Sequence, residues 1–195
     1  MGLDSVELLM EVEKFFDINI PDLEAEKIYT IQNMVDSVAG HLNITNESMK
    51  LRDSIFEKVV EGIHEIGWTA KAIELSDYIS SCIPANNKED WKALSKCLKL
   101  SVPKPDDGKN YGNKISVKLK NLLSWSPDYN WEEITIEQFV AAVCANNYLD
   151  LIEKTSIRNK YEIYIAVMAI TVDKIGVDYY EVGPDKSFTS DLGVD

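Results

Sequence analysis

The sequence predicts an all-α protein, because apolar residues recur at intervals of three and four rather than two along almost the whole chain. The composition agrees with this fold class, since hydrophobic residues make up 45% and charged residues 27% of the chain. Its 195 residues suffice for one large domain or two small ones with a buried core. Collagen-like, low-complexity and largely disordered chains are thereby excluded.

The first expected helix spans residues 5–16. Its expected inward residues are Val6, Leu9, Met10, Val12 and Phe16. Its outer stripe holds Glu7, Glu11 and Lys14. Ile20-Pro21 ends this pattern, and a short helical turn is expected at residues 22–27. Thr30 is expected to cap a helix with the inward residues Ile31, Met34, Val35, Val38 and Leu42.

Residues 43–48 form a polar linker, after which helices are expected at residues 51–66, 69–83, 87–98, 114–123 and 135–153. The last of these opens with Thr135-Ile-Glu-Gln138, the pattern of a capping box. A final helix over residues 157–175 ends at Gly176, a residue suited to a helix C-terminus. Because residues 167–172 are apolar or nearly so all round, we expect this helix to be buried on every side.

The net charge of −13 is concentrated at the two ends of the chain. Residues 1–48 hold 2 basic and 10 acidic residues, whereas residues 49–155 hold 14 and 16, and residues 156–195 hold 4 and 7. This balance disfavours binding to nucleic acid or to a membrane surface and favours partners that present Lys and Arg. The longest apolar run, at residues 163–172, is about half the length of a membrane-spanning helix, so we expect a soluble cytoplasmic protein.

No motif for catalysis or metal binding stands out. The cysteines, Cys82, Cys97 and Cys144, are odd in number and lack ligand spacing, so we expect buried free thiols and no metal site. His41 and His64 lie on expected helices without a nucleophile pattern nearby, and the chain has no Gly-rich phosphate loop. We therefore expect that the protein is not an enzyme.

Both ends of the chain carry a recognisable pattern. Residues 166–195 read AVMAITVDKIGVDYYEVGPDKSFTSDLGVD, and residues 3–42 read LDSVELLMEVEKFFDINIPDLEAEKIYTIQNMVDSVAGHL. Joined in that order, they resemble acyl carrier protein: the first stretch is similar to its first helix and long loop, and the second to its second, third and fourth helices. The match covers about 70 residues, and their order is circularly permuted relative to the family.

The resemblance implies an acyl-carrier-type four-helix bundle, formed by residues 1–48 and 156–195 around an inserted helical domain of unknown role at residues 49–155. About 40 residues rarely form a stable core alone, so the C-terminal helix is expected to cover the N-terminal ones. We favour closure within one chain, a monomer, and the alternative is a helix-swapped dimer. A natural permutation, an engineered one and a trimmed tandem array would each give this order.

In the carrier family, a serine directly after Asp-Leu-Gly-x-Asp bears 4'-phosphopantetheine, attached by a phosphopantetheinyl transferase, and its thiol holds acyl groups as thioesters. A helix N-terminus suits this phosphodiester. Here the slot lies between Asp195 and Leu3 and is occupied by Gly2. Ser5 lies three residues later, about 4.5 Å along a helix, and is the fallback site. The cofactor is therefore expected from the family but expected to be absent from this chain.

The resemblance implies an acyl-carrier-like domain that presents phosphopantetheine-bound acyl groups to enzymes of fatty-acid or polyketide type, inactive as a carrier because of Gly2. The residues at positions where the family meets such enzymes, acidic groups against Lys/Arg patches, are Leu3, Asp4, Val6, Glu7, Met10 and Glu13. The alternative is a protein-interaction or regulatory domain that uses the carrier fold as a scaffold, which the loss of the serine favours.

A lysine-rich stretch raises a further hypothesis. The region from Lys88 to Lys120 holds nine lysines and four acidic residues, which gives it a local net charge of +5. It would therefore suit the acidic first helix as a built-in partner within the same chain. An ordinary solvated face is the alternative. The lysines are Lys88, Lys92, Lys96, Lys99, Lys104, Lys109, Lys114, Lys118 and Lys120.

Overall fold

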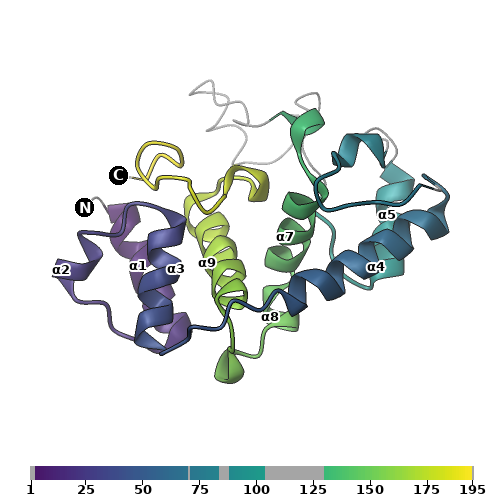
Figure 1. Cartoon of the computed structure of the whole chain (residues 1–195). Coiled ribbons are helices and arrows are strands. Elements are labelled where there is room, and N and C mark those ends of the chain that lie inside the picture. Colours follow the sequence, from purple (N-terminus) through teal and green to yellow (C-terminus); the bar gives the residue numbers. More distant parts are fainter. Residues whose placement is uncertain (1–2, 70, 84–87, 104–129, 195) are drawn as a thin grey trace.

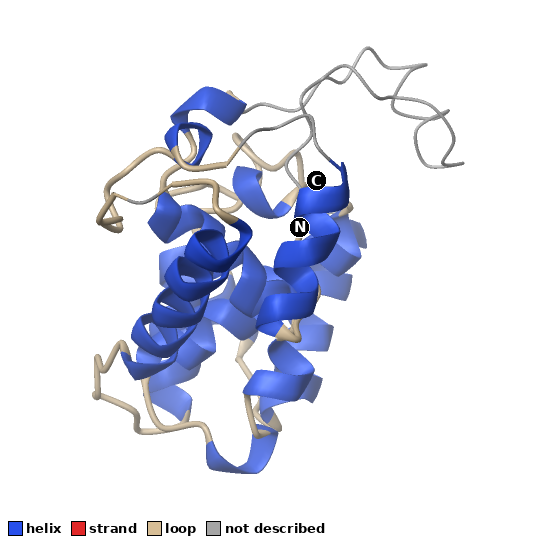
Figure 2. Ribbon diagram, turned by 90° about the vertical axis from the view of Figure 1, so that its right-hand side faces the viewer, coloured by secondary structure: helices blue, strands red, loops and turns tan. Residues whose placement is uncertain are grey.

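The computed structural model describes residues 3–69, 71–83, 88–103 and 130–194, and the described chain is all-helical, as predicted (Figures 1 and 2). The α-helices are α1 (Leu3–Phe16), α2 (Asp22–Ala25), α3 (Ile31–His41), α4 (Lys50–Ile66), α5 (Lys88–Leu98), α7 (Ile136–Asn146), α8 (Tyr148–Leu151) and α9 (Lys160–Ile175). Short 3-10 helices lie at Ile79–Ser81, Trp131–Glu133, Lys154–Ser156 and Tyr179–Glu181. Within these ranges, no helix has both the length and the apolar character needed to cross a membrane.

Helix α9 lies at the centre of the molecule, with α1 and α3 packed on one side and α7 on the other (Figure 1). Every residue from Ile165 to Thr171 is buried, which confirms the prediction for residues 167–171, and Val172 is partly buried. The helix ends at Gly176, whose φ of +76° is the left-handed conformation expected there. Buried side chains on both sides of α9 belong to one core, and the predicted division at residues 48 and 156 stays a prediction.

The inward face of α1 differs from the predicted one. Val6 and Met10 were expected inside but are 39% and 59% exposed, whereas Leu8, Val12 and Phe16 are buried. Residues four apart lie on one face of a helix, so Leu8 rather than Val6 begins the inward stripe. Val6 and Met10 form an exposed apolar strip on another face of α1.

The starts of α3 and α7 confirm the predicted caps. The Thr30 hydroxyl accepts from the Asn33 N–H at 3.2 Å, and the Asn33 side chain accepts from the Thr30 N–H at 3.2 Å. In the same way the Thr135 hydroxyl accepts from the Gln138 N–H at 3.2 Å, and the Gln138 side chain accepts from the Thr135 N–H at 2.9 Å. Each pair satisfies two backbone donors that the helix leaves open.

Beyond α7, helix α4 packs against α5 and α7. The Trp91 ring lies edge-on to the Phe139 ring, with 5.9 Å between the ring centres. A Cβ at Gly62 would lie 2.8 Å from methyl groups of both Leu94 and Leu98, so glycine permits α4 and α5 to approach closely.

The helix predicted over residues 69–83 is wrong. In the described part of this stretch the backbone bonds instead to the residues just before α7 and to the first residues of α7. The Ile79 N–H donates to the Ile134 carbonyl at 2.8 Å, and the Ile136 N–H donates to the Asp77 carbonyl at 2.8 Å. These long-range bonds satisfy backbone groups that a helix would have paired locally.

The single helix predicted over residues 135–153 is in fact α7 followed by α8, and Asn147 causes the break. This residue is buried, and its side-chain amide nitrogen donates to the carbonyls of Ser101 and Val143, each at 2.7 Å. Its side-chain oxygen accepts from the Ser101 N–H at 2.8 Å. Asn147 therefore anchors a distant segment and leaves the helical conformation, with φ −123° and ψ 22°. The helix predicted at residues 114–123 lies outside the described residues.

The lysine-rich stretch is described only in part. Helix α5, which carries Lys92 and Lys96 and is followed by Lys99, lies at the opposite end of the molecule from α1 (Figure 1). These lysines therefore do not cover α1. The lysines from Lys104 to Lys120 lie outside the described residues, so the built-in-partner hypothesis stays a prediction for them.

Candidate functional site

The start of α1 and the C-terminal segment border a common hollow of about 260 Å³. Figure 1 shows α1 and the C-terminal segment that follows α9, coloured yellow, at the same end of the molecule. The start of α1 and the Asp-Leu-Gly-Val sequence both line this hollow, although the two stretches lie at opposite ends of the chain. Its lining residues are mostly apolar: Ser5, Leu8, Leu9, Ala25, Glu26, Ile28, Tyr29, Met34, Phe188, Thr189 and Val194.

Backbone hydrogen bonds attach the C-terminal segment to the start of α3. The Phe188 N–H donates to the Tyr29 carbonyl at 3.0 Å, and the Ile31 N–H donates to the Lys186 carbonyl at 3.1 Å. Thr30 and Ser187 form the isolated antiparallel bridge between these bonds. The cap of α3 and the attachment of the C-terminal segment thus depend on the same few residues.

The Asp-Leu-Gly-Val sequence forms a compact turn. The Asp191 side chain accepts from the Ser187 N–H at 2.7 Å, and the Val194 N–H donates to the Phe188 carbonyl at 2.8 Å. Gly193 has a φ of +66°, a left-handed conformation that favours glycine. This turn buries Val194 against the core and places it in the wall of the hollow.

Most of the predicted recognition residues lie on the surface of α1. Asp4, Val6, Glu7 and Met10 are exposed. Leu3 is the first residue of α1, and its side chain lies outside the described residues, as do Gly2 and Asp195. Ser5 is half-buried and lines the hollow.

Glu13 has an internal role that the sequence did not predict. One of its carboxylate oxygens accepts from the Ile20 N–H at 2.6 Å and holds the chain as it leaves α1. The turn between them contains Asp17 at a φ of +54°. A separation of seven residues across a turn follows no helical spacing, so no pattern in the sequence indicates this bond.

Basic side chains contact the C-terminal half of α1. Lys174 of α9 lies 3.6 Å from the Glu11 carboxylate. Lys154 donates to the Lys14 carbonyl at 2.9 Å and lies 5.6 Å from the centre of the Phe15 ring. Both contacts lie beyond the exposed strip at the N-terminal half of the helix.

Glu24 links the short helix α2, next to the hollow, to α3. Its carboxylate accepts from the Ser37 hydroxyl at 2.6 Å through one oxygen and lies 3.1 Å from His41 Nε2 through the other. The Ser37 hydrogen bond, followed by the hydrogen bond and charge of His41, lowers the pKa of Glu24. Because the carboxylate stands between them, His41 does not contact the Ser37 hydroxyl as a general base for nucleophilic attack would.

This link predicts a pH-dependent contribution to stability. The folded state lowers the pKa of Glu24 below 4.5, so its stabilising effect is present above about pH 4.5 and is lost as the pH falls through the lowered pKa. We expect Glu24→Gln to lower the melting temperature at pH 7, and we expect its difference from the wild type to be smaller at pH 3. Thermal melts followed by circular dichroism test this, with Glu26→Gln as the matched loss of charge. An equal difference at both pH values would contradict the assignment.

The three cysteines differ in burial, and His64 lies beside a backbone carbonyl. Cys82 and Cys144 are buried, and burial raises the pKa of Cys144 to about 12. Cys97 was expected to be buried but is exposed, because Leu94 and Leu98 provide the inward face of α5. His64 Nε2 lies 3.0 Å from the Lys71 carbonyl. Among the described residues, no group of three His, Cys, Asp or Glu side chains is placed to hold a metal.

Attachment of phosphopantetheine depends on a hydroxyl at the start of α1, and the two positions that the resemblance offers there differ. The attachment slot implied by the resemblance holds Gly2, which has no hydroxyl. Ser5 does have one, but it belongs to the helix itself and lines the hollow from within α1. The site therefore supplies an apolar hollow, an exposed helix surface and the hydroxyl of Ser5, and the expected absence of the arm stays a prediction.

No protein-family model matches the chain, and no solved structure matches it. Its function is therefore inferred from its own residues.

Proposed function

We propose that the chain is an acyl-carrier-like module that keeps the recognition surface of a carrier but has lost its attachment serine. The observation that carries this proposal is the shared hollow, which Ser5 lines from the start of α1 and Val194 lines from the Asp-Leu-Gly-Val turn. A circularly permuted carrier, closed within one chain, requires these two stretches to be neighbours.

The exposed surface of α1 supports a role in recognition. Val6 and Met10 form an apolar strip, and Asp4 and Glu7 provide exposed carboxylates at the same end of the helix. Apolar anchors surrounded by charge are typical of protein interfaces, and acidic groups steer partners that carry Lys and Arg patches. The partners we propose are carrier-dependent enzymes of fatty-acid or polyketide metabolism and the phosphopantetheinyl transferase.

The proposed module is noncatalytic and cytoplasmic. His41 and His64 each lie beside an internal acceptor, the Glu24 carboxylate and the Lys71 carbonyl respectively. The cysteines are free thiols, as is usual in a reducing compartment. Both features agree with a binding module in the cytoplasm.

The loss of the serine predicts the outcome of a modification experiment. We expect the 195-residue chain to gain no mass when incubated with a phosphopantetheinyl transferase and coenzyme A, because Gly2 offers no hydroxyl. Gly2→Ser supplies a hydroxyl in the slot and is expected to gain one arm, as measured by intact mass. An arm on the wild-type chain that Ser5→Ala removes would contradict the assignment of the slot to Gly2.

The recognition surface predicts a second result. Met10→Glu is expected to weaken binding of Gly2→Ser to the transferase at least tenfold, because it places a carboxylate in the apolar strip. Since Met10 is 59% exposed, the change should alter the free energy of unfolding by less than about 0.5 kcal/mol. Binding is measured by surface plasmon resonance, with the exposed Glu57→Gln on α4 as a control distant in sequence. Unchanged affinity would contradict the assignment of α1 as the recognition surface.

The second candidate is a protein-interaction or regulatory domain that uses a carrier fold as a scaffold. Gly2 favours it, because a scaffold does not need the serine. Failure of Gly2→Ser to accept the arm, together with a folded chain, would support the scaffold over the carrier.

A further inference from the structure

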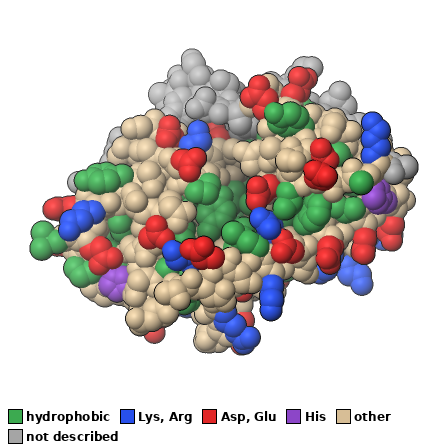
Figure 3. All heavy atoms as spheres, viewed as in Figure 1, with side chains coloured by type: hydrophobic (Ala, Val, Ile, Leu, Met, Phe, Trp, Pro, Cys, Tyr) green, Lys and Arg blue, Asp and Glu red, His purple; other side chains and the backbone are tan. Residues whose placement is uncertain are grey.

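A second cavity, of about 400 Å³, lies between α3, α7 and α9, and it shares no lining residue with the hollow beside α1. Figure 3 shows the face of the molecule seen in Figure 1, and apolar side chains are recessed near its middle with charged side chains around them. The lining residues are Gln32, Val35, Glu47, Met49, Glu137, Gln138, Ala141, Lys160, Tyr161, Tyr164 and Pro184.

The size and the walls of this cavity suit a small organic molecule. Small-molecule sites commonly measure about 300–1,000 Å³, and an apolar cavity of about 150 Å³ already binds benzene. The Tyr161 and Tyr164 rings form part of the wall, with 6.1 Å between their centres and planes tilted by 50°. Val35, Met49 and Ala141 add aliphatic surface. A ligand with an apolar body would displace water from these groups.

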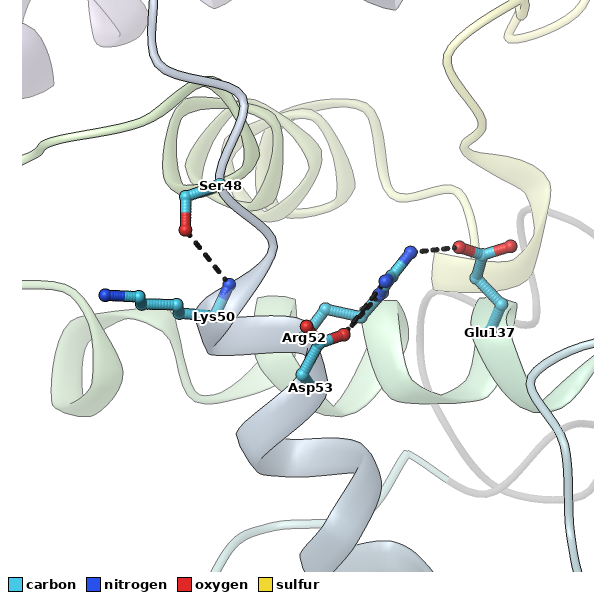
Figure 4. A network of polar contacts seen from close by, with 5 residues as sticks. All are labelled: Ser48, Lys50, Arg52, Asp53 and Glu137. Atoms are coloured by element: carbon cyan, nitrogen blue, oxygen red, sulfur yellow. Dashed lines mark hydrogen bonds and ion pairs between the residues drawn. The ribbon is translucent and has the colours of Figure 1, made fainter.

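The charged groups around the cavity are already paired with one another. Lys160 lies 3.2 Å from Asp36 and 3.6 Å from Glu47. Figure 4 shows the Arg52 guanidinium between Asp53 and Glu137, at 2.8 and 3.0 Å from their oxygens. A charged ligand would have to compete with these internal partners, whereas an uncharged ligand leaves them intact.

The lining residues with neutral polar groups are two glutamines and two tyrosines. Gln32 and Gln138 carry amides, and the Gln138 oxygen is already bonded to the Thr135 N–H at 2.9 Å. Tyr161 and Tyr164 carry hydroxyls. A ligand needs only one or two hydrogen-bonding groups to match such a wall. We propose that the cavity between α3, α7 and α9 binds a small uncharged molecule with a mainly apolar body, independently of the carrier function.

N-phenyl-1-naphthylamine, an uncharged apolar fluorophore, tests this proposal at pH 7. We expect saturable binding to the full chain. Ala141→Leu, which fills the cavity, should weaken it at least tenfold, whereas Ala25→Leu, which fills the hollow beside α1, should change it less than twofold. Absence of saturable binding, or equal losses in the two variants, would overturn the proposal.

Competition then tests the charge of the ligand. 1-Octanol should displace the fluorophore at a concentration at least tenfold lower than octanoate or octylammonium. Equal displacement by either ion would show that the internal ion pairs do not select against charge, and it would overturn the proposed class of ligand.

Two further measurements keep the test decisive if Ala141→Leu does not fold. Met49 lines the cavity and is 38% exposed, so Met49→Glu should leave the circular dichroism spectrum unchanged. It should weaken binding of the fluorophore at least tenfold. Unchanged affinity in a folded Met49→Glu would overturn the proposal. So would a wild-type dimer that Met49→Glu converts to monomer, because the cavity would then be an interface between two copies of the chain.

Discussion

A chain that lacks residues 156–195 is expected to lose the helicity of α1, α2 and α3 as well as that of α9. The buried faces of α1 and α3 both pack against α9, and the C-terminal segment closes the hollow beside α1. Without these elements Leu8, Val12 and Val35 would face water. About 40 residues do not bury enough apolar surface to repay the entropy of ordering them.

The measurement is far-ultraviolet circular dichroism combined with amide exchange along α1. We expect no cooperative melting of α1–α3 in the truncated chain, and recovery of exchange protection when a peptide of residues 156–195 is added in trans. Recovery in trans would distinguish missing packing from a general fault of the shortened chain. Native exchange protection of α1 without residues 156–195 would contradict the closed arrangement.

The sequence sufficed to predict those parts of the fold that depend on local chemistry. Thr30 and Thr135 cap their helices through partners three residues away, and Gly176 ends α9 because the required left-handed backbone conformation favours glycine. Burial of α9 also followed from its own residues, since a helix that is apolar all round has no face suited to water.

The sequence failed where a residue bonds to a distant part of the chain. Asn147 interrupts a helix-forming stretch because it pairs with Ser101, and the backbone around Asp77 pairs with the start of α7. Glu13 and Glu24 likewise act through partners that no helical spacing specifies. Tertiary hydrogen bonds of this kind override local propensity, and they became visible only in the folded chain.

The sequence could indicate one of the two candidate sites but not the other. The exposed acids of α1 follow from helix periodicity and from the resemblance, so the sequence could indicate them. The cavity between α3, α7 and α9 could not be predicted, because its walls come from segments whose relative positions the sequence does not define.

Val167→Asp is expected to destabilise the protein by at least about 4 kcal/mol, because it buries a carboxylate in the central helix without a partner. Val167 is fully buried, and α9 joins the helices on its two sides. Its neighbour Thr171 shows what this site tolerates: a buried hydroxyl that donates to the Val167 carbonyl at 2.8 Å. Val167→Thr can make the same kind of bond and should cost only about 1–2 kcal/mol.

Urea unfolding followed by tryptophan fluorescence and circular dichroism measures both variants. The matched control is Val6→Asp, the same chemical change at an exposed position near the start of α1, where a carboxylate is favourable and stability should change by less than about 0.5 kcal/mol. Burial raises the pKa of an introduced carboxyl, so the penalty in Val167→Asp should be smaller at pH 4 than at pH 8. A penalty independent of pH would show that the loss comes from packing rather than from a buried charge, because protonation removes the charge and leaves the shape unchanged.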